Sequence, residues 1–152
     1  MKTNAPAKTV VQSTLQKQQT DLKQVMQFAK QGKVINSKFG IGTTVDTLFE
    51  KVGRPEYDGG LSYGDFEFFT KDGSYEKPVS YIMSTDKKIT SIRYKTVKSI
   101  LGKPYKDLEY KGEHIVTYKA GKYVVTFSFP SLYSTVSDQQ KNPKVTSYSV
   151  YK

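Results

Sequence analysis

The sequence lacks cysteine and tryptophan altogether, and it contains one histidine among 152 residues. Without cysteine the chain can form no disulfide and no thiolate metal site, and a single histidine does not supply the ligand set of a zinc centre. Calcium-loop spacing, phosphate-cradling glycine loops and dinucleotide fingerprints are also missing from the sequence. We therefore expect neither a metal nor a cofactor.

Long apolar runs and arginine are scarce as well. The longest apolar stretches, such as Tyr123–Phe127, have the length of a strand, whereas a membrane helix needs roughly 20 residues. Arginine occurs only at Arg54 and Arg93, and bidentate reading of phosphates or base edges favours its planar guanidinium. We expect no transmembrane segment and no specific nucleic-acid binding.

The chain is strongly basic, with a formal net charge of +10 that comes almost wholly from lysine. The lysines are scattered and form no block of five or six. Two interpretations stay open: a solubilising surface, or loose attraction to an anionic cell-wall polymer or lipid surface.

Residues 1–8 are expected to form a disordered tail. Met1–Ala7 has no apolar region of the kind that a signal peptide requires, yet its Ala/Pro-rich composition resembles what remains after signal-peptide cleavage. We expect a secreted or cell-envelope protein whose signal peptide is absent from this chain. The alternative is an ordinary cytosolic N-terminus.

The first part of the chain has the apolar periodicity of helices, and the part that follows has the alternation of strands. Apolar residues at spacings of three, four and seven predict a helix over 10–31 that ends at Gly32. A short second helix follows, with Thr43 as its cap and Asp46 as the capping-box acid, and it ends at Gly53-Arg54-Pro55. Alternation then predicts strands near 61–63, 66–69, 79–83 and 89–94, with a turn at Asp72-Gly73.

The same order then repeats. A helical segment over 95–101 ends at Gly102-Lys103-Pro104, 49 residues after the first Gly-x-Pro, and strands near 110–118, 123–129 and 145–148 follow around a loop over 130–143. The strand at 145–148 also echoes Ile89–Ile92. This pattern predicts one α+β domain over 9–152, built from two repeats over 9–94 and 95–152, with an antiparallel sheet carrying helices on one face.

The two Gly-x-Pro motifs, Gly53/Pro55 and Gly102/Pro104, each followed by an antiparallel meander, suggest a family. The units resemble those of the β-lactamase-inhibitor-protein-like fold and of small outer-membrane assembly lipoproteins. From about Thr9 to Lys152 the chain resembles the YjgB-like domain of unknown function, which is typically exported from Gram-positive bacteria. The resemblance implies two stacked units forming a curved sheet with a concave face free to grip a partner. It does not imply lactamase inhibition, because the inhibitors' loop residues have no counterpart here and those inhibitors carry disulfides.

The search for catalytic chemistry finds no constellation. His114 lies on a predicted strand without a nucleophile elbow and is expected to be a satisfied or surface histidine. Asp65 and Glu67 share a strand face and Glu109 follows on a later strand, so a glycosidase pair is conceivable, but a solvated strand face is favoured. We expect a protein that is not an enzyme.

Aromatic residues are abundant, with 12 Tyr and 8 Phe. Phe66, Phe68, Phe127 and Phe129 are expected in the core, while strand tyrosines are either half-buried sheet residues or binding contacts. The candidate binding residues are Tyr63, Tyr81, Tyr110, Tyr118, Tyr123 and Tyr148. We expect an exported binding or inhibitory module that holds an envelope or secreted protein through a Tyr/Lys-rich sheet face. The alternative is a structural envelope protein that binds an anionic polymer or lipid surface by lysine charge.

Overall fold

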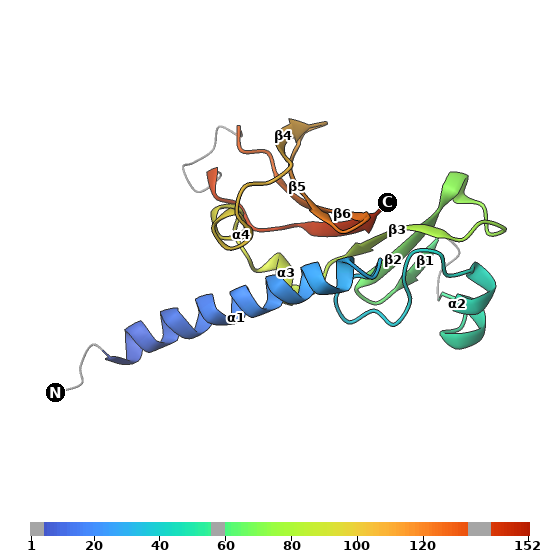
Figure 1. Cartoon of the computed structure of the whole chain (residues 1–152), viewed down its shortest axis with the longest axis horizontal. Helices are drawn as coiled ribbons and strands as arrows, with labels where there is room; N and C mark the ends of the chain where they lie inside the picture. The colour runs from blue at the N-terminus through green and yellow to red at the C-terminus, as the bar shows by residue number, and fades with distance from the viewer. Residues whose placement is uncertain (1–4, 56–59, 134–140) are drawn as a thin grey trace.

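A computed structural model describes residues 5–55, 60–133 and 141–152, with the side chains from residue 13 onward. Its centre is a seven-stranded antiparallel sheet in the order β1-β2-β3-β7-β6-β5-β4 (Figure 1). In chain order the strands are β1 Leu61–Tyr63, β2 Phe66–Thr70, β3 Val79–Ser84, β4 Lys106–Tyr110, β5 Glu113–Ala120, β6 Tyr123–Pro130 and β7 Ser147–Tyr151. The α+β class with an antiparallel sheet is confirmed.

The long helix α1, Ala5–Ala29, packs its C-terminal half against β5, β6 and the two helices α3 and α4. Leu22, Val25 and Ala29 are fully buried there, whereas the N-terminal half extends past the sheet (Figure 1). The helix begins at Ala5, so residues 5–8 are helical and were wrongly assigned to a tail. Proline is well tolerated in a first helical turn, which accounts for a helix that includes Pro6. Residues 1–4 lie outside the described residues.

Helix α2, Val45–Lys51, is capped one residue later than predicted. The cap is Thr44, whose hydroxyl oxygen accepts a hydrogen bond from the Thr47 amide at 3.1 Å. The buried residues Val45 and Leu48 face inward. The helix ends before Gly53, whose φ of +96° suits glycine.

The predicted strand over 89–94 is wrong, because residues 89–90 end one helix, residues 91–93 form a turn with a single β-bridge at Arg93, and Tyr94 begins the next helix. Asp86 accepts a hydrogen bond from the Lys88 amide at 2.9 Å and caps the one-turn helix α3, Lys87–Thr90. Helix α4, Tyr94–Leu101, follows almost at once, as predicted for 95–101. Ile89 in α3 and Ile92 in the turn that follows it are both fully buried.

Two strands in the second half also differ from the prediction. The expected strand over 110–118 is broken by a turn at Lys111 and Gly112, both with positive φ. Residues 106–110 instead form the edge strand β4, which pairs antiparallel with β5. The last strand occupies 147–151 rather than 145–148. Part of the predicted loop over 130–143 lies outside the described residues.

The sheet has one covered and one uncovered face. The side chains of Phe68, Phe127 and Phe129 are buried on the covered face and Phe66 is half-buried there, as predicted. Figure 1 shows α1 and α3 on this side. We call the opposite side the open face.

The strand pairing is approximately symmetric about the centre of the sheet. Strands β1, β2 and β3 pair in the same order as β5, β6 and β7, and the two sets meet where β3 runs antiparallel to β7. The symmetry point is the Met83–Ser149 pair, with Ile82 opposite Val150 on one side and Ser84 opposite Tyr148 on the other. Strand β4 has no counterpart in the first half.

The two Gly-x-Pro turns carry the same tyrosine contact. The Tyr63 hydroxyl donates to the Gly53 carbonyl at 2.8 Å, and the Tyr118 hydroxyl donates to the Gly102 carbonyl at 2.8 Å. Tyr63 lies on β1 and Tyr118 on β5, which are matching strands in the symmetric pairing. Each helix end is thereby tied to the matching strand of its own half, β1 or β5.

Candidate functional site

A row of aromatic side chains lies on the open face, across the middle of the sheet. The rings of Phe69 and Tyr81 meet edge to face with centroids 5.4 Å apart, and those of Tyr81 and Tyr151 stack at 5.4 Å. Strand alternation places all three on the face opposite the core residues Phe68, Ile82 and Val150. We call Phe69, Tyr81 and Tyr151 the aromatic row.

Hydroxyl groups extend this row toward β5. The Tyr151 hydroxyl lies 2.9 Å from that of Thr126 on β6, and Thr126 lies 2.9 Å from the hydroxyl of Thr117 on β5. Thr117 pairs in turn with Lys106 on the edge strand. A chain of hydroxyl contacts on this side of the sheet therefore links β7, β6 and β5, with Thr117 itself only 2% exposed.

Two lysines and a tyrosine stand at the β4 end of this face. The Lys119 ammonium lies 4.2 Å from the centre of the Tyr105 ring, and that of Lys106 lies 5.9 Å from it. Tyr105 is 61% exposed. We call Tyr105, Lys106 and Lys119 the cationic corner.

Behind the corner, on the covered face, lies a charge cluster formed by Tyr94, Lys98, Asp107, Glu109 and His114. His114 is 4% exposed; its Nε2 lies 2.6 Å from Asp107 Oδ1, and its Nδ1 contacts Glu109 Oε2. Asp107 also accepts from the Lys98 ammonium at 2.7 Å and from the Tyr94 hydroxyl at 2.8 Å. The cluster joins α4, β4 and β5.

The electrostatics of the cluster follow from these contacts. Burial opposes ionisation of Asp107 and Glu109, but hydrogen bonds outweigh it and hold the pKa of each carboxyl below its usual value. The donors are chiefly Lys98 for Asp107 and Ser131 for Glu109, and His114 serves both. The hydrogen bond to Asp107 in turn raises the pKa of Lys98. Both ring nitrogens of His114 face carboxylates, so either nitrogen can donate a hydrogen bond to a carboxylate when it carries a proton.

This geometry does not assemble a catalytic triad. Ser131 donates its hydroxyl to Glu109, and the Leu132 amide donates to the same carboxylate at 3.3 Å. The serine therefore contacts a carboxylate rather than a histidine nitrogen, and His114 has no free nitrogen to act as a base. The conceivable glycosidase pair also fails, because Asp65 lies in the β1–β2 turn and Glu109 is on the opposite edge of the sheet from Glu67.

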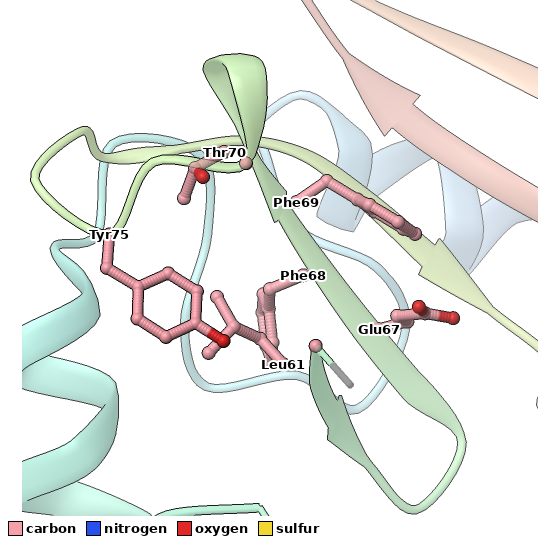
Figure 2. A pocket seen from close by; sticks show the side chains of 8 residues that line it. Leu61, Glu67, Phe68, Phe69, Thr70 and Tyr75 are labelled. Carbon is pink, nitrogen blue, oxygen red and sulfur yellow. The ribbon is translucent and has the colours of Figure 1, made fainter. Parts of the chain in front are cut away.

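A cavity of about 600 Å³ lies at the β1–β2 edge. Its lining includes Glu67, Phe69 and Tyr75 (Figure 2). Glu67 and Phe69 point to one side of β2 and Tyr75 lies on the other side, so the rings and the carboxylate do not converge on one point (Figure 2). The cavity follows a sheet edge rather than forming a ligand cage.

The six predicted tyrosines do not form one surface. Tyr81 and Tyr110 lie on the open face. Tyr148 is fully buried and Tyr118 is 6% exposed, so both belong to the core and were wrongly placed on a binding face; burial raises the pKa of Tyr118 to about 12. Tyr63 and Tyr123 are half-buried on the covered side, where the Tyr123 ring packs against Gly32.

Several residues of the open face were missed. Phe69, Tyr105 and Tyr151 were not proposed as binding residues, and neither were the lysines of the cationic corner. The run Lys106-Asp107-Leu108-Glu109-Tyr110 alternates acids with lysine, leucine and tyrosine. A period-two analysis of that run would have indicated the strand and separated its two faces.

Within the described ranges no cluster of three or more His, Cys, Asp or Glu could hold a metal ion. The helices in those ranges are all too short or too polar to cross a membrane.

The fold and the open face define a class: a small α+β domain with a seven-stranded antiparallel sheet, covered by helices on one side. The chain belongs to the family described as "Domain of unknown function (DUF4309)", which matches residues 22–151. Its structure is similar to the crystal structure of a DUF4309 family protein (YjgB) from Bacillus subtilis subsp. subtilis str. 168, with a TM-score of 0.65 and 14% identity. The match covers 90% of this chain and 98% of that one, and at this identity it shows the fold alone. No curated protein matches the chain.

Proposed function

We propose that this protein is an exported, non-catalytic binding domain that holds a protein partner on the open face of its sheet. The observation that carries the proposal is the aromatic row, which continues through a hydroxyl chain to the cationic corner. Phe69 is 38% exposed and Tyr105 is 61% exposed. Aromatic side chains, tyrosine above all, supply large contact area at low entropy cost and dominate protein interfaces.

The two halves of the domain support a tandem origin of the β-lactamase-inhibitor-protein-like kind. The matching hydrogen bonds from Tyr63 to Gly53 and from Tyr118 to Gly102 favour duplication of one helix-plus-sheet unit. So does the 49-residue offset between the Gly-x-Pro motifs. A sheet made of two such units offers a wider surface than either unit alone.

Export from a Gram-positive cell is part of the proposal. Its support is membership of the same family as a Bacillus subtilis protein whose structure this chain resembles. A second candidate function, attachment to an anionic cell-wall polymer or lipid surface, is favoured by the net charge of +10.

The test compares binding by wild type and by a Tyr81→Ala/Tyr151→Ala variant, which removes two rings of the aromatic row. Each is immobilised and exposed to envelope and secreted proteins at low and at high salt. The control is Tyr133→Ala, which removes a 77% exposed tyrosine from the loop after β6, and circular dichroism verifies that all variants are folded.

We expect one discrete protein to be retained at high salt by wild type and by the control, but not by the double variant. Retention that salt abolishes and that is indifferent to the two tyrosines would refute the aromatic row as a binding surface. It would favour the polymer-binding alternative, since exposed charges are screened by salt.

A further inference from the structure

We infer that the cationic corner binds an acidic stretch of the protein partner, in extended form, along the β4 edge. This inference rests on the proposed function and adds the chemistry of the partner and the place where it sits.

The first argument is the division of charge across β4. Its two acids, Asp107 and Glu109, face the covered side and are held there by Lys98 and His114. Lys106, on the same strand, alternates to the open face. The edge strand thus carries two carboxylates in its sequence but presents neither to a ligand on the open face.

The second argument is that the lysines of the corner remain available. The ion pairs found between described residues all belong to the charge cluster, and neither Lys106 nor Lys119 takes part in one. The Tyr105 ring lies close to both ammonium groups, so the two positive charges are held near one another. An anionic group placed between them would be attracted by both.

The third argument selects a peptide over a phosphate polymer. Next to the corner on the same face, Leu108 is 41% exposed and Tyr110 is 53% exposed. Apolar side chains of a peptide can cover these residues, whereas a phosphate backbone cannot. The corner also lacks arginine, the residue whose fork matches phosphate bidentately.

Glu113 limits the length of the acidic stretch. It lies opposite Tyr110 on the open face and is exposed. At about 3.3 Å per residue, it stands roughly 13 Å along the strands from Lys106. The partner is therefore expected to place its acids near the corner and apolar residues further along β4.

The test measures binding of a labelled ten-residue peptide, five acidic residues followed by five apolar or small ones, by fluorescence anisotropy. The variant is Lys106→Glu/Lys119→Glu. The matched control is Lys87→Glu/Lys88→Glu, which makes the same charge change at exposed residues of α3 on the covered side.

We expect wild type and the control to bind with similar affinity, and the corner variant to bind about tenfold more weakly or not at all. A lysine peptide of equal length should not bind. Equal losses in both variants would overturn the inference, because net charge alone would then account for binding. Tighter binding of inorganic polyphosphate than of the peptide would overturn the choice of partner.

The same proteins separate this inference from the proposed function. Loss of partner retention in Tyr81→Ala/Tyr151→Ala, with none in Lys106→Glu/Lys119→Glu, would leave the open face as the binding surface and refute the acidic stretch. Retention that neither variant reduces would refute both.

Discussion

Replacement of His114 by leucine should destabilise the domain through two carboxylates at once. The imidazole is 4% exposed and contacts both Asp107 and Glu109. A hydrogen bond to a charged group is worth about 1.5–3 kcal/mol, but each carboxylate side chain is 25% exposed, and water recovers part of that. We expect the free energy of unfolding to fall by about 2–4 kcal/mol.

The assay is urea unfolding followed by circular dichroism, because the chain has no tryptophan. Glu113→Gln is the matched control, since it removes one charge from the exposed end of the same strand. Its unfolding free energy should change by less than about 0.5 kcal/mol. If the unfolding free energy of His114→Leu fell by no more than that of the control, this would refute the view that the charge cluster stabilises the position of β4.

The pH dependence gives a second, independent readout. Asp107 and Glu109 have lowered pKa values in the folded protein, so they contribute stability above their unfolded pKa values of about 4. That contribution is lost as the pH falls through the lower pKa values that the two carboxyls have in the folded protein. In His114→Leu the lowering is smaller, so the unfolding free energy should drop less between about pH 5 and pH 3 than in wild type. If the unfolding free energy of the variant fell by as much as that of wild type over this pH range, the result would contradict this account.

Two further predictions concern tyrosine and glycine positions. Tyr118→Phe should lower the free energy of unfolding by about 0.5–1.5 kcal/mol, because its buried hydroxyl donates to a turn carbonyl, whereas Tyr110→Phe, at an exposed site, should have no measurable effect in the same urea titration. Gly32→Ala should cost more than Gly42→Ala: both have positive φ, but a Cβ at Gly32 would lie 2.8 Å from the Tyr123 ring while at Gly42 it meets nothing within 4 Å. Equal melting temperatures for the two alanine variants would refute the steric part of that argument.

The sequence predicted those parts of the fold that depend on single residues or on the alternation within one strand. Gly53 and Gly102, with the prolines two residues later, marked helix ends because positive φ and a missing amide are properties of single residues. The core phenylalanines followed from alternation. The one-turn helix Lys87–Thr90 and the turn after it were missed because Ile89 and Ile92 also fit a β-branched strand, and the Asp86 cap decides between them.

The proposed binding face could not be predicted in the same way. Tyr81 and Tyr148 are both strand tyrosines, yet one lies on the open face and the other is fully buried. Which face of the sheet a residue occupies, and which face the helices cover, depends on how the strands pair, and alternation within one strand does not determine either. The charge cluster depends on β4, a strand whose exposed, mixed residues gave no apolar signal.

Strand β4 is where the second half of the domain departs from the first. The symmetric pairing accounts for β1–β2–β3 and β5–β6–β7, and it leaves β4 as an added edge beyond β5. The charge cluster and the cationic corner both depend on that strand, because it supplies Asp107 and Glu109 to the covered side and Lys106 to the open side. A sheet of two equal halves would present two equivalent edges to a partner. The added strand makes the two edges chemically different, since its acids are neutralised on the covered side and its lysine lies on the open side. The proposed partner is therefore expected to bind in only one orientation.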